Sequence, residues 1–311
     1  MKNYFLTDGS ADPFHPVFER FLFNEARHLR TQSHEGWHTF SWVHTEQQQV
    51  VAQVHFHIEH GLAASPHRAP FGSVEFADSL APEMLLRFLW EVEKKLKEKG
   101  VKKVVIRDTP QLYRPQASAL LTVLLGDMGF AVKRNEICAS IVIDASPWEN
   151  KISKDEAYHL RRAQRERLIF RQLELTQWAS VYQFIDQCRA ERGMTLSLSA
   201  QQLGNTIQAC PHDFLFFEVC QAEERIAAAI AVRVNPRIMY NFYYGHSRAS
   251  QPLSPIVFLL HQQYAYGQEK GYQLLDLGTS SLENKTNFSL LNFKTQVGGN
   301  LSMKLTFEKS L

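Results

Sequence analysis

The fold is decided by the aromatic segment Tyr240-Asn241-Phe242-Tyr243-Tyr244-Gly245 and the elements that follow it. The segment is rich in aromatic side chains that favour β-structure, so it predicts a strand. A helix pattern then begins at Pro255 and closes with Glu269-Lys270-Gly271, where the glycine marks the end of the helix. The apolar segment Leu274-Leu275-Asp276-Leu277-Gly278 follows at once and predicts a second, short strand.

The same order of elements occurs once before, in the first half of the chain. Residues 71–76 predict a strand, a helix closes with Glu98-Lys99-Gly100, and residues 104–108 predict the next short strand. The two Lys-Gly helix ends lie 171 positions apart (270 − 99), and the two strand glycines lie 173 apart (245 − 72). A repeat with so long a period predicts two tandem domains of one fold, over residues 1–145 and 146–311.

Length and composition agree with this organisation. A chain of 311 residues with 44% apolar residues fits two units of common domain size, each with its own core. Its 34 basic and 32 acidic residues nearly balance, so any basic binding site has to be local. The four cysteines show no zinc-ligand spacing and predict buried thiols of a reducing compartment. Since no signal-peptide pattern and no membrane-spanning apolar run are found, we expect a cytoplasmic protein.

Each half is predicted to contain a strand, one or more helices, a three-stranded meander, and then helix, strand, helix and strand. This order predicts an α/β (α+β) fold whose mixed, mostly antiparallel sheet is flanked by helices. It resembles the GNAT acyltransferase fold. The second half is similar to the Fem-type and CelD-like acyltransferases, which consist of tandem GNAT domains. The likeness is carried by residues 160–165, 240–245, 270–271, 276–278, and Asn292-Phe293-Lys294 before Gly298-Gly299.

The resemblance implies transfer of an acyl group to an amine, in a V-shaped opening between strands 240–245 and 273–277. GNAT enzymes hold the pyrophosphate of coenzyme A with a glycine-rich loop at a helix N-terminus. Here residues 245–255 contain two prolines and no second glycine, and the first-half counterpart, residues 76–82, contains no glycine. We therefore expect weak binding of acyl-CoA and no tightly bound cofactor. Fem-type enzymes lack that loop and take aminoacyl-tRNA, so acyl-CoA and aminoacyl-tRNA are both possible donors.

Tyr244 and Asp276 are the candidate catalytic residues. Because side chains alternate along a strand, Tyr240, Phe242 and Tyr244 are predicted to share one face and Tyr243 the other. Tyr244 then lines an acyl or amine pocket, or the aromatic residues simply pack a central strand. Asp276 either binds or deprotonates an amine, or it caps the turn that follows the strand.

Ser281, Asn287 and Lys294 are the candidate substrate-binding residues. The first two belong to a polar loop, which also contains Asn284, where the family fold admits its substrate. The alternative is an ordinary loop that ends in the N-cap of the last helix. Lys294 either contacts an anionic substrate or packs its aliphatic stem on that helix.

Arg161 and Arg162 begin a dense basic run in a predicted helix and are candidate contacts for phosphate groups or a tRNA backbone. The alternative is a solvated helix with no such role. His55 and His57 share one face of a predicted strand near His60, but no further ligand completes a metal site at typical spacing. We predict no metal site.

These observations favour an N-acyltransferase or aminoacyltransferase whose acceptor is a small-molecule or peptide amine, with tRNA as a possible partner and no membrane span. The rival hypotheses are a binding protein with a degenerate GNAT-like cleft and a structural scaffold. The site is predicted in the second domain, because residues 71–72 and 107–110 of the first lack the tyrosine run and the polar loop. No oligomeric state is predicted.

Overall fold

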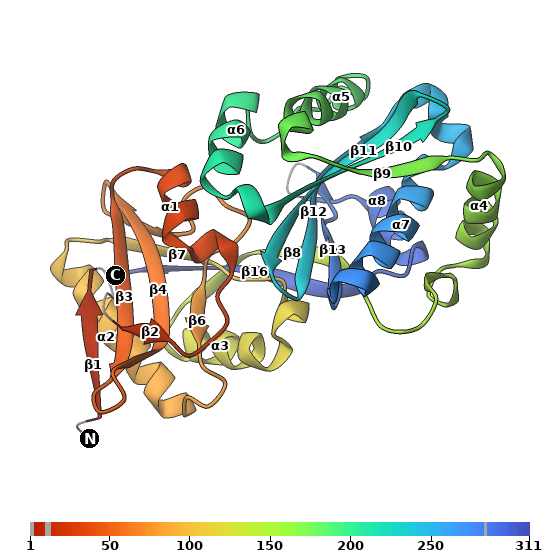
Figure 1. Ribbon diagram of the computed structural model, residues 1–311. Helices are drawn as coiled ribbons and strands as arrows, with labels where there is room; N and C mark the ends of the chain where they lie inside the picture. The colour runs from red at the N-terminus through yellow and green to blue at the C-terminus, as the bar shows by residue number, and fades with distance from the viewer. Residues whose placement is uncertain (1–2, 10–13, 283–284) are drawn as a thin grey trace. The chain divides into compact units, whose positions relative to one another are not determined.

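The computed structural model describes residues 3–9, 14–282 and 285–311 (Figure 1). Packing divides the chain into two compact units. Unit 1 comprises Met1–Glu136 with Met303–Leu311, and unit 2 comprises Ile137–Ser302. The domain boundary at residues 145/146 stays a prediction; by packing, residues 137–145 belong to unit 2 and residues 303–311 to unit 1.

The strands of unit 1 form a sheet with the order β1-β3-β4-β5-β7-β16, and β2 and β6 also pair with β4. They are β1 (Tyr4–Asp8), β2 (His15–Pro16), β3 (Trp37–His44), β4 (Gln49–Glu59), β5 (Leu62–Ser65), β6 (Val74–Phe76), β7 (Lys103–Arg107) and most of β16 (Asn300–Ser310). The helical segments are η1 (Leu22–Asn24), α1 (Ala26–Gln32), α2 (Pro82–Glu98), η2 (Gln111–Tyr113) and α3 (Pro115–Asp127). Most neighbouring strands are antiparallel, but β5 pairs with β7 and β2 pairs with β4 in parallel.

Unit 2 has the strand order β8-β13-β12-β11-β10-β9, in which only β12 and β13 are parallel. The strands are the end of β8 (Ala131–Val142), β9 (Ile169–Leu173), β10 (Phe214–Gln221), β11 (Glu224–Asn235), β12 (Ile238–His246) and β13 (Leu274–Thr279). A small hairpin of β14 (Ser281–Leu282) and β15 (Lys285–Thr286) follows β13. The helical segments are η3 (Trp148–Asn150), α4 (Lys154–Arg165), η4 (Leu175–Gln177), α5 (Trp178–Ala190), α6 (Ala200–Ala209), η5 (Pro211–Asp213), η6 (Arg248–Leu253), α7 (Pro255–Lys270) and α8 (Phe288–Gln296).

Each unit has its own apolar core. In unit 1 the core lies between one sheet face and the buried stripes of α2 and α3, including Leu85, Phe88 and Leu121. In unit 2 the alanines at 227, 229 and 231 of β11 face α7 and α4. The α5 helix packs against β10, β11 and β12. Its residue Cys188 contacts Gly245, which pairs with Ala228, so α5 lies on the sheet face opposite to α7. The sheet of unit 2 is therefore covered by helices on both faces.

The apolar residues Phe18, Phe21, Leu22 and Leu29 predict a helix over residues 16–30, and this prediction is wrong. Phe21 has an extended backbone, a short 3-10 turn follows at Leu22–Asn24, and the α-helix begins only at Ala26. Three successive side chains, Phe21, Leu22 and Phe23, are all buried, whereas one face of a helix cannot bury three neighbours. The backbone N–H of Phe21 also donates to the buried carboxylate of Glu75 at 2.6 Å, which fixes the extended path.

Two strand predictions also differ from the structure. The strand expected over residues 71–76 is confined to β6, and the unpredicted β5 precedes it. The sequence also predicts a pair of strands across residues 130–143, but this segment forms the single long strand β8. In unit 2, the strand predicted at 240–245, the helix predicted from Pro255 and the strand predicted at 274–278 lie within two residues of their predicted bounds, whereas the sequence predicts a loop where the hairpin of β14 and β15 lies.

Candidate functional site

The candidate site of unit 2 lies where the parallel strands β12 and β13 separate (Figure 1). The two strands pair over three residues each, and the last pair is Tyr240 with Asp276. Beyond this pair β12 continues to His246 and β13 to Thr279 without pairing to each other. We call the space between these two unpaired ends the split. Backbone N–H and C=O groups that no longer serve the sheet need other hydrogen-bond partners there.

A β-bulge reverses the predicted facing of the aromatic residues in β12. Tyr243 pairs with Ile230 and Asn241 pairs with Ala231, so Phe242 is an extra residue with no partner in β11. Tyr244 consequently packs on the α7 side with the core of unit 2. The hydroxyl of Tyr243 lies 2.6 Å from Ser197 Oγ, away from that core. The prediction that Tyr240 and Tyr244 share one face is wrong, because the extra residue shifts the alternation by one.

A second irregularity lies on the other side of the split, in β13. The register against β8 shifts between Asp276 and Thr279, and Gly278 adopts a φ of +74°. The carboxylate of Asp276, which is 2% exposed, accepts the backbone N–H of Gly278 at 2.7 Å. It also accepts the hydroxyl of Ser140 at 3.4 Å. Asp276 therefore caps the turn after β13, which was the alternative to a catalytic role. The catalytic role of Asp276 stays a prediction.

The side chain of Lys294 enters the split from α8 and is 1% exposed. Its ammonium donates to the carbonyl oxygens of Gly278 at 2.9 Å and Thr279 at 2.7 Å. Burial lowers the pKa of Lys294 to about 8, although the nearby Asp276 carboxylate counteracts this effect. An ammonium has three N–H donors, so one remains without a partner among the described residues. Sequence reasoning singled out this lysine, and the structure places it at the end of β13.

The tyrosines beside the split are un-ionised at neutral pH. Burial raises the pKa of Tyr244 to about 12, and burial raises that of Tyr240 well above its usual value. The negative charge of Asp276 also raises the pKa of both phenols. Either hydroxyl would therefore act as a neutral hydrogen-bond donor rather than as a phenolate base.

Ser281 and Asn287 lie at the two ends of the short hairpin after β13. Ser281 is half-buried in β14, whereas Asn284 lies outside the described residues. The side chain of Asn287 accepts the backbone N–H of Leu290 at 3.0 Å and so caps α8. That contact is the alternative considered for Asn287, and the substrate-binding role of both residues stays a prediction.

The structure adds two residues that sequence reasoning had not selected. Ser280 is 1% exposed, and its hydroxyl has no hydrogen-bond partner among the described residues. Arg189, on α5, donates to the carbonyl oxygen of Tyr244 at 3.4 Å. The loop signal around Ser280 was present in the sequence, but 55 positions separate Arg189 from Tyr244 and no local pattern connects them.

Arg161 and Arg162 lie on the exposed side of α4. Neither forms an ion pair with a described carboxylate, and Arg165 and Arg167 nearby are exposed as well. The serine before α4 connects this helix to α8, because the backbone N–H of Ser153 donates to Gln296 O at 2.8 Å. The four arginines form an exposed basic surface of unit 2, and their contact with an anion stays a prediction.

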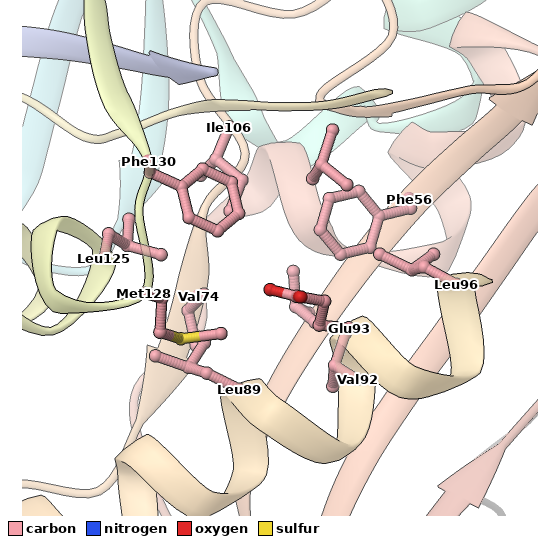
Figure 2. A pocket seen from close by; sticks show the side chains of 12 residues that line it. Phe56, Val74, Leu89, Val92, Glu93, Leu96, Ile106, Leu125, Met128 and Phe130 are labelled. Carbon is pink, nitrogen blue, oxygen red and sulfur yellow. The ribbon is translucent and has the colours of Figure 1, made fainter. Parts of the chain in front are cut away.

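The counterpart region of unit 1 is filled by apolar side chains. There β5 pairs with β7, while β6 pairs with β4 and separates from β7. Figure 2 shows the small cavity that remains and the Glu93 carboxylate beside it. That carboxylate binds Lys97 at 2.8 Å and Lys309 at 2.6 Å. The other lining residues are Val54, Phe56, Val74, Leu89, Val92, Leu96, Val104, Ile106, Leu125, Met128 and Phe130. This lining offers no nucleophile and no free cation for acyl-transfer chemistry.

Unit 1 holds two buried carboxyl groups near these strands, Glu75 on β6 and Asp108 directly after β7. Burial raises the pKa of Glu75 to about 7 and that of Asp108 to about 6. Asp108 accepts the hydroxyl of Ser73 at 2.6 Å, and Ser73 has a φ of +78°. These bonds fix the backbone between β5 and β6.

Within the described part of the chain, no group of three or more His, Cys, Asp or Glu side chains is arranged to hold a metal ion. His55 hydrogen-bonds Thr39 at 2.8 Å, and burial lowers the pKa of this imidazole to about 3. The described helices include none with the length and apolar character needed to cross a bilayer.

Solved structures with a similar fold cover nearly the whole chain. FemX is 13% identical, with a TM-score of 0.71 over 94% of this chain and 93% of FemX. The C-terminal domain of a putative lysylphosphatidylglycerol synthetase from Agrobacterium fabrum is 12% identical, with a TM-score of 0.58 over 85% and 81% of the two chains. A tandem GNAT protein from the clavulanic acid biosynthesis pathway is 9% identical, with a TM-score of 0.50 over 99% and 98%.

No protein-family model matches the sequence, and no curated protein matches it. At these low identities the structural likeness concerns the fold and not the activity. The prediction of two GNAT-like domains, each with a mixed and mostly antiparallel sheet, is confirmed. The chain therefore has the Fem-like tandem GNAT fold.

Proposed function

We propose that unit 2 transfers an acyl or aminoacyl group from an activated ester or thioester to an amine, within the split. The observation that carries this proposal is the buried ammonium of Lys294 at the point where β12 and β13 have separated. A buried cation with an unused donor is suited to a carbonyl oxygen that becomes negative during the reaction.

The reaction needs little covalent chemistry from the protein. The neutral amine attacks the carbonyl carbon, the new C–N bond forms, and the carbonyl oxygen becomes an oxyanion. Collapse of this intermediate breaks the bond to the alkoxide or thiolate leaving group, which takes up the proton that the amine loses and departs as the alcohol or thiol. The free N–H of Lys294 stabilises the oxyanion, while its bonds to Gly278 and Thr279 hold the ammonium in place.

Asp276 keeps this lysine charged. Its carboxylate raises the pKa of Lys294 against the effect of burial, so the ammonium persists at neutral pH. The same carboxylate orients the turn at Gly278, whose carbonyl binds the ammonium. Asp276 is thus a positioning residue that acts through Lys294.

Two features favour aminoacyl-tRNA over acyl-CoA as the donor. The start of α7, where GNAT enzymes hold pyrophosphate, offers few N–H donors. Pro255 has none, and the N–H of Val257 bonds to Ser254 O at 3.1 Å. The unpaired arginines of α4 provide positive charge for a phosphodiester backbone. One structural neighbour is the C-terminal domain of a putative lysylphosphatidylglycerol synthetase, which agrees with an aminoacyl donor.

The test is transfer of a radiolabelled aminoacyl group from a mixture of aminoacyl-tRNAs to a panel of small and peptide amines. We expect an amide product with the wild type and a loss of about 100- to 1,000-fold in kcat with Lys294→Met. Lys304→Met is the matched control, because Lys304 is a buried lysine of unit 1, paired with Glu136. It should retain activity at temperatures where it remains folded. The absence of product from both tRNA and acyl-CoA donors would contradict the proposal.

A further inference from the structure

Arg189 is a half-buried arginine of α5 that has no carboxylate partner among the described residues. Its guanidinium donates to Tyr244 O at 3.4 Å and to the sulfur of Met194 at 3.8 Å, both of which are long contacts. Other half-buried arginines of unit 2 are paired: Arg225 with Glu218 at 2.7 Å and Arg233 with Asp213 at 2.9 Å. Within the part of the chain that the structure describes, no carboxylate therefore compensates the charge of Arg189.

The position of Arg189 gives the split a cation on each of its two sides. Tyr244, whose carbonyl it contacts, lies on the unpaired end of β12, and Lys294 is bound to the unpaired end of β13. The positive charge of Arg189 lowers the pKa of both the Tyr244 phenol and the Lys294 ammonium. The Asp276 carboxylate raises the pKa of the same two groups, and it is already hydrogen-bonded to the backbone N–H of Gly278. Among the described residues, two cations and one hydrogen-bonded carboxylate give the split a net positive charge.

We infer that Arg189 binds an anionic group of the substrate, a carboxylate or a phosphate, next to the reacting carbonyl. The inference rests on the proposed function and adds the substrate class: one of the two reactants carries an anion beside its reacting group. A guanidinium suits this role because its planar fork of N–H donors matches the oxygens of either anion in a bidentate manner. A carboxylate would indicate an amino-acid-like reactant, and a phosphate would indicate a nucleotide or a phospholipid.

The test measures anion binding without turnover, with acetate and inorganic phosphate as the probes at constant ionic strength in chloride. The Nε–Hε resonance of Arg189 in a spectrum of arginine-labelled protein reports binding directly. We expect saturable binding of one probe by the wild type, and a loss of about tenfold or more in Arg189→Met. The Arg189→Lys variant should bind with intermediate affinity, since it keeps the charge and loses the fork.

Arg192→Met is the matched control, because this neighbouring arginine already pairs with Glu191 at 3.8 Å and donates to Cys188 O at 2.7 Å. It should change the affinity less than threefold, whereas a general effect of positive charge would weaken both variants equally. The inference is overturned if the wild type binds neither probe more tightly than chloride, or if Arg189→Met binds both unchanged.

The two proposals fail separately. Anion binding that depends on Arg189, without any amide product, would sink the acyl-transfer proposal and leave the anion site in place. Amide formation with unchanged KM values for both reactants in Arg189→Met would overturn the anion site and leave the acyl-transfer proposal in place.

Discussion

Replacement of Lys294 by methionine should change how the stability of unit 2 depends on pH. The pKa of Lys294 falls from 10.5 to about 8 on folding, so the unfolded chain binds more protons than the folded chain between these values. Stability attributable to this group therefore rises as the pH increases from 8 to 10.5, and it is constant at its lowest value below pH 8. The shift of about 2.5 pKa units corresponds to about 3 kcal/mol of unfolding free energy.

The assay is urea unfolding of the wild type and of Lys294→Met over this pH range, followed by tryptophan fluorescence. Trp148 is 1% exposed in unit 2 and reports its unfolding. Because all other titrating groups are shared, the wild-type free energy minus that of the variant isolates the lysine. We expect this difference to increase by about 3 kcal/mol between pH 8 and pH 10.5. A difference that does not change with pH would show that the lysine is not buried as a charge.

Other variants test separate parts of the structure. Asp276→Asn should lower the unfolding free energy by about 1–3 kcal/mol in chemical denaturation, because the buried Gly278 N–H loses its charged acceptor; full stability with lost turnover would instead favour a catalytic aspartate. Gly278→Ala should cost about 1–2 kcal/mol through its φ of +74°, and an unchanged melting curve would contradict that conformation. Folding raises the pKa of Glu75 to about 7, so the unfolding free energy of the wild type should fall by about 3 kcal/mol between pH 4.5 and pH 7 through this carboxyl group. The Glu75→Gln variant should lack this fall. Arg161→Gln combined with Arg162→Gln should weaken tRNA binding and reduce its salt dependence by about two ionic contacts in filter-binding titrations, and an unaltered salt slope would exclude these contacts.

Local sequence patterns were sufficient for the order of elements in unit 2. The alternating apolar residues of β11, the proline at the start of α7 and the glycine after its end each act over a few positions. The motif with Lys294 was likewise visible, because it lies in a short helix before a glycine pair.

Other features depend on contacts that no local pattern encodes. The bulge at Phe242 inserts a single residue without a distinguishing composition, and it reverses every facing predicted for the tyrosines that follow. Arg189 lies beside Tyr244, with no carboxylate partner among the described residues, only because α5 has packed against β12. In unit 1, the extended path at Phe21 requires the Glu75 carboxylate, 54 positions away. Tertiary packing overrides local propensity at each of these places.

The central claim is that the reacting carbonyl lies in the split of unit 2, against Lys294. The most direct measurement is a crystal structure with an adenosine that carries an aminoacyl group through a stable 3′-amide, the analogue of an aminoacyl-tRNA end. We predict the analogue carbonyl oxygen within about 3 Å of Lys294 Nζ, between the unpaired ends of β12 and β13. Ordered density for the analogue in unit 1, or in unit 2 but away from Lys294, would contradict the account.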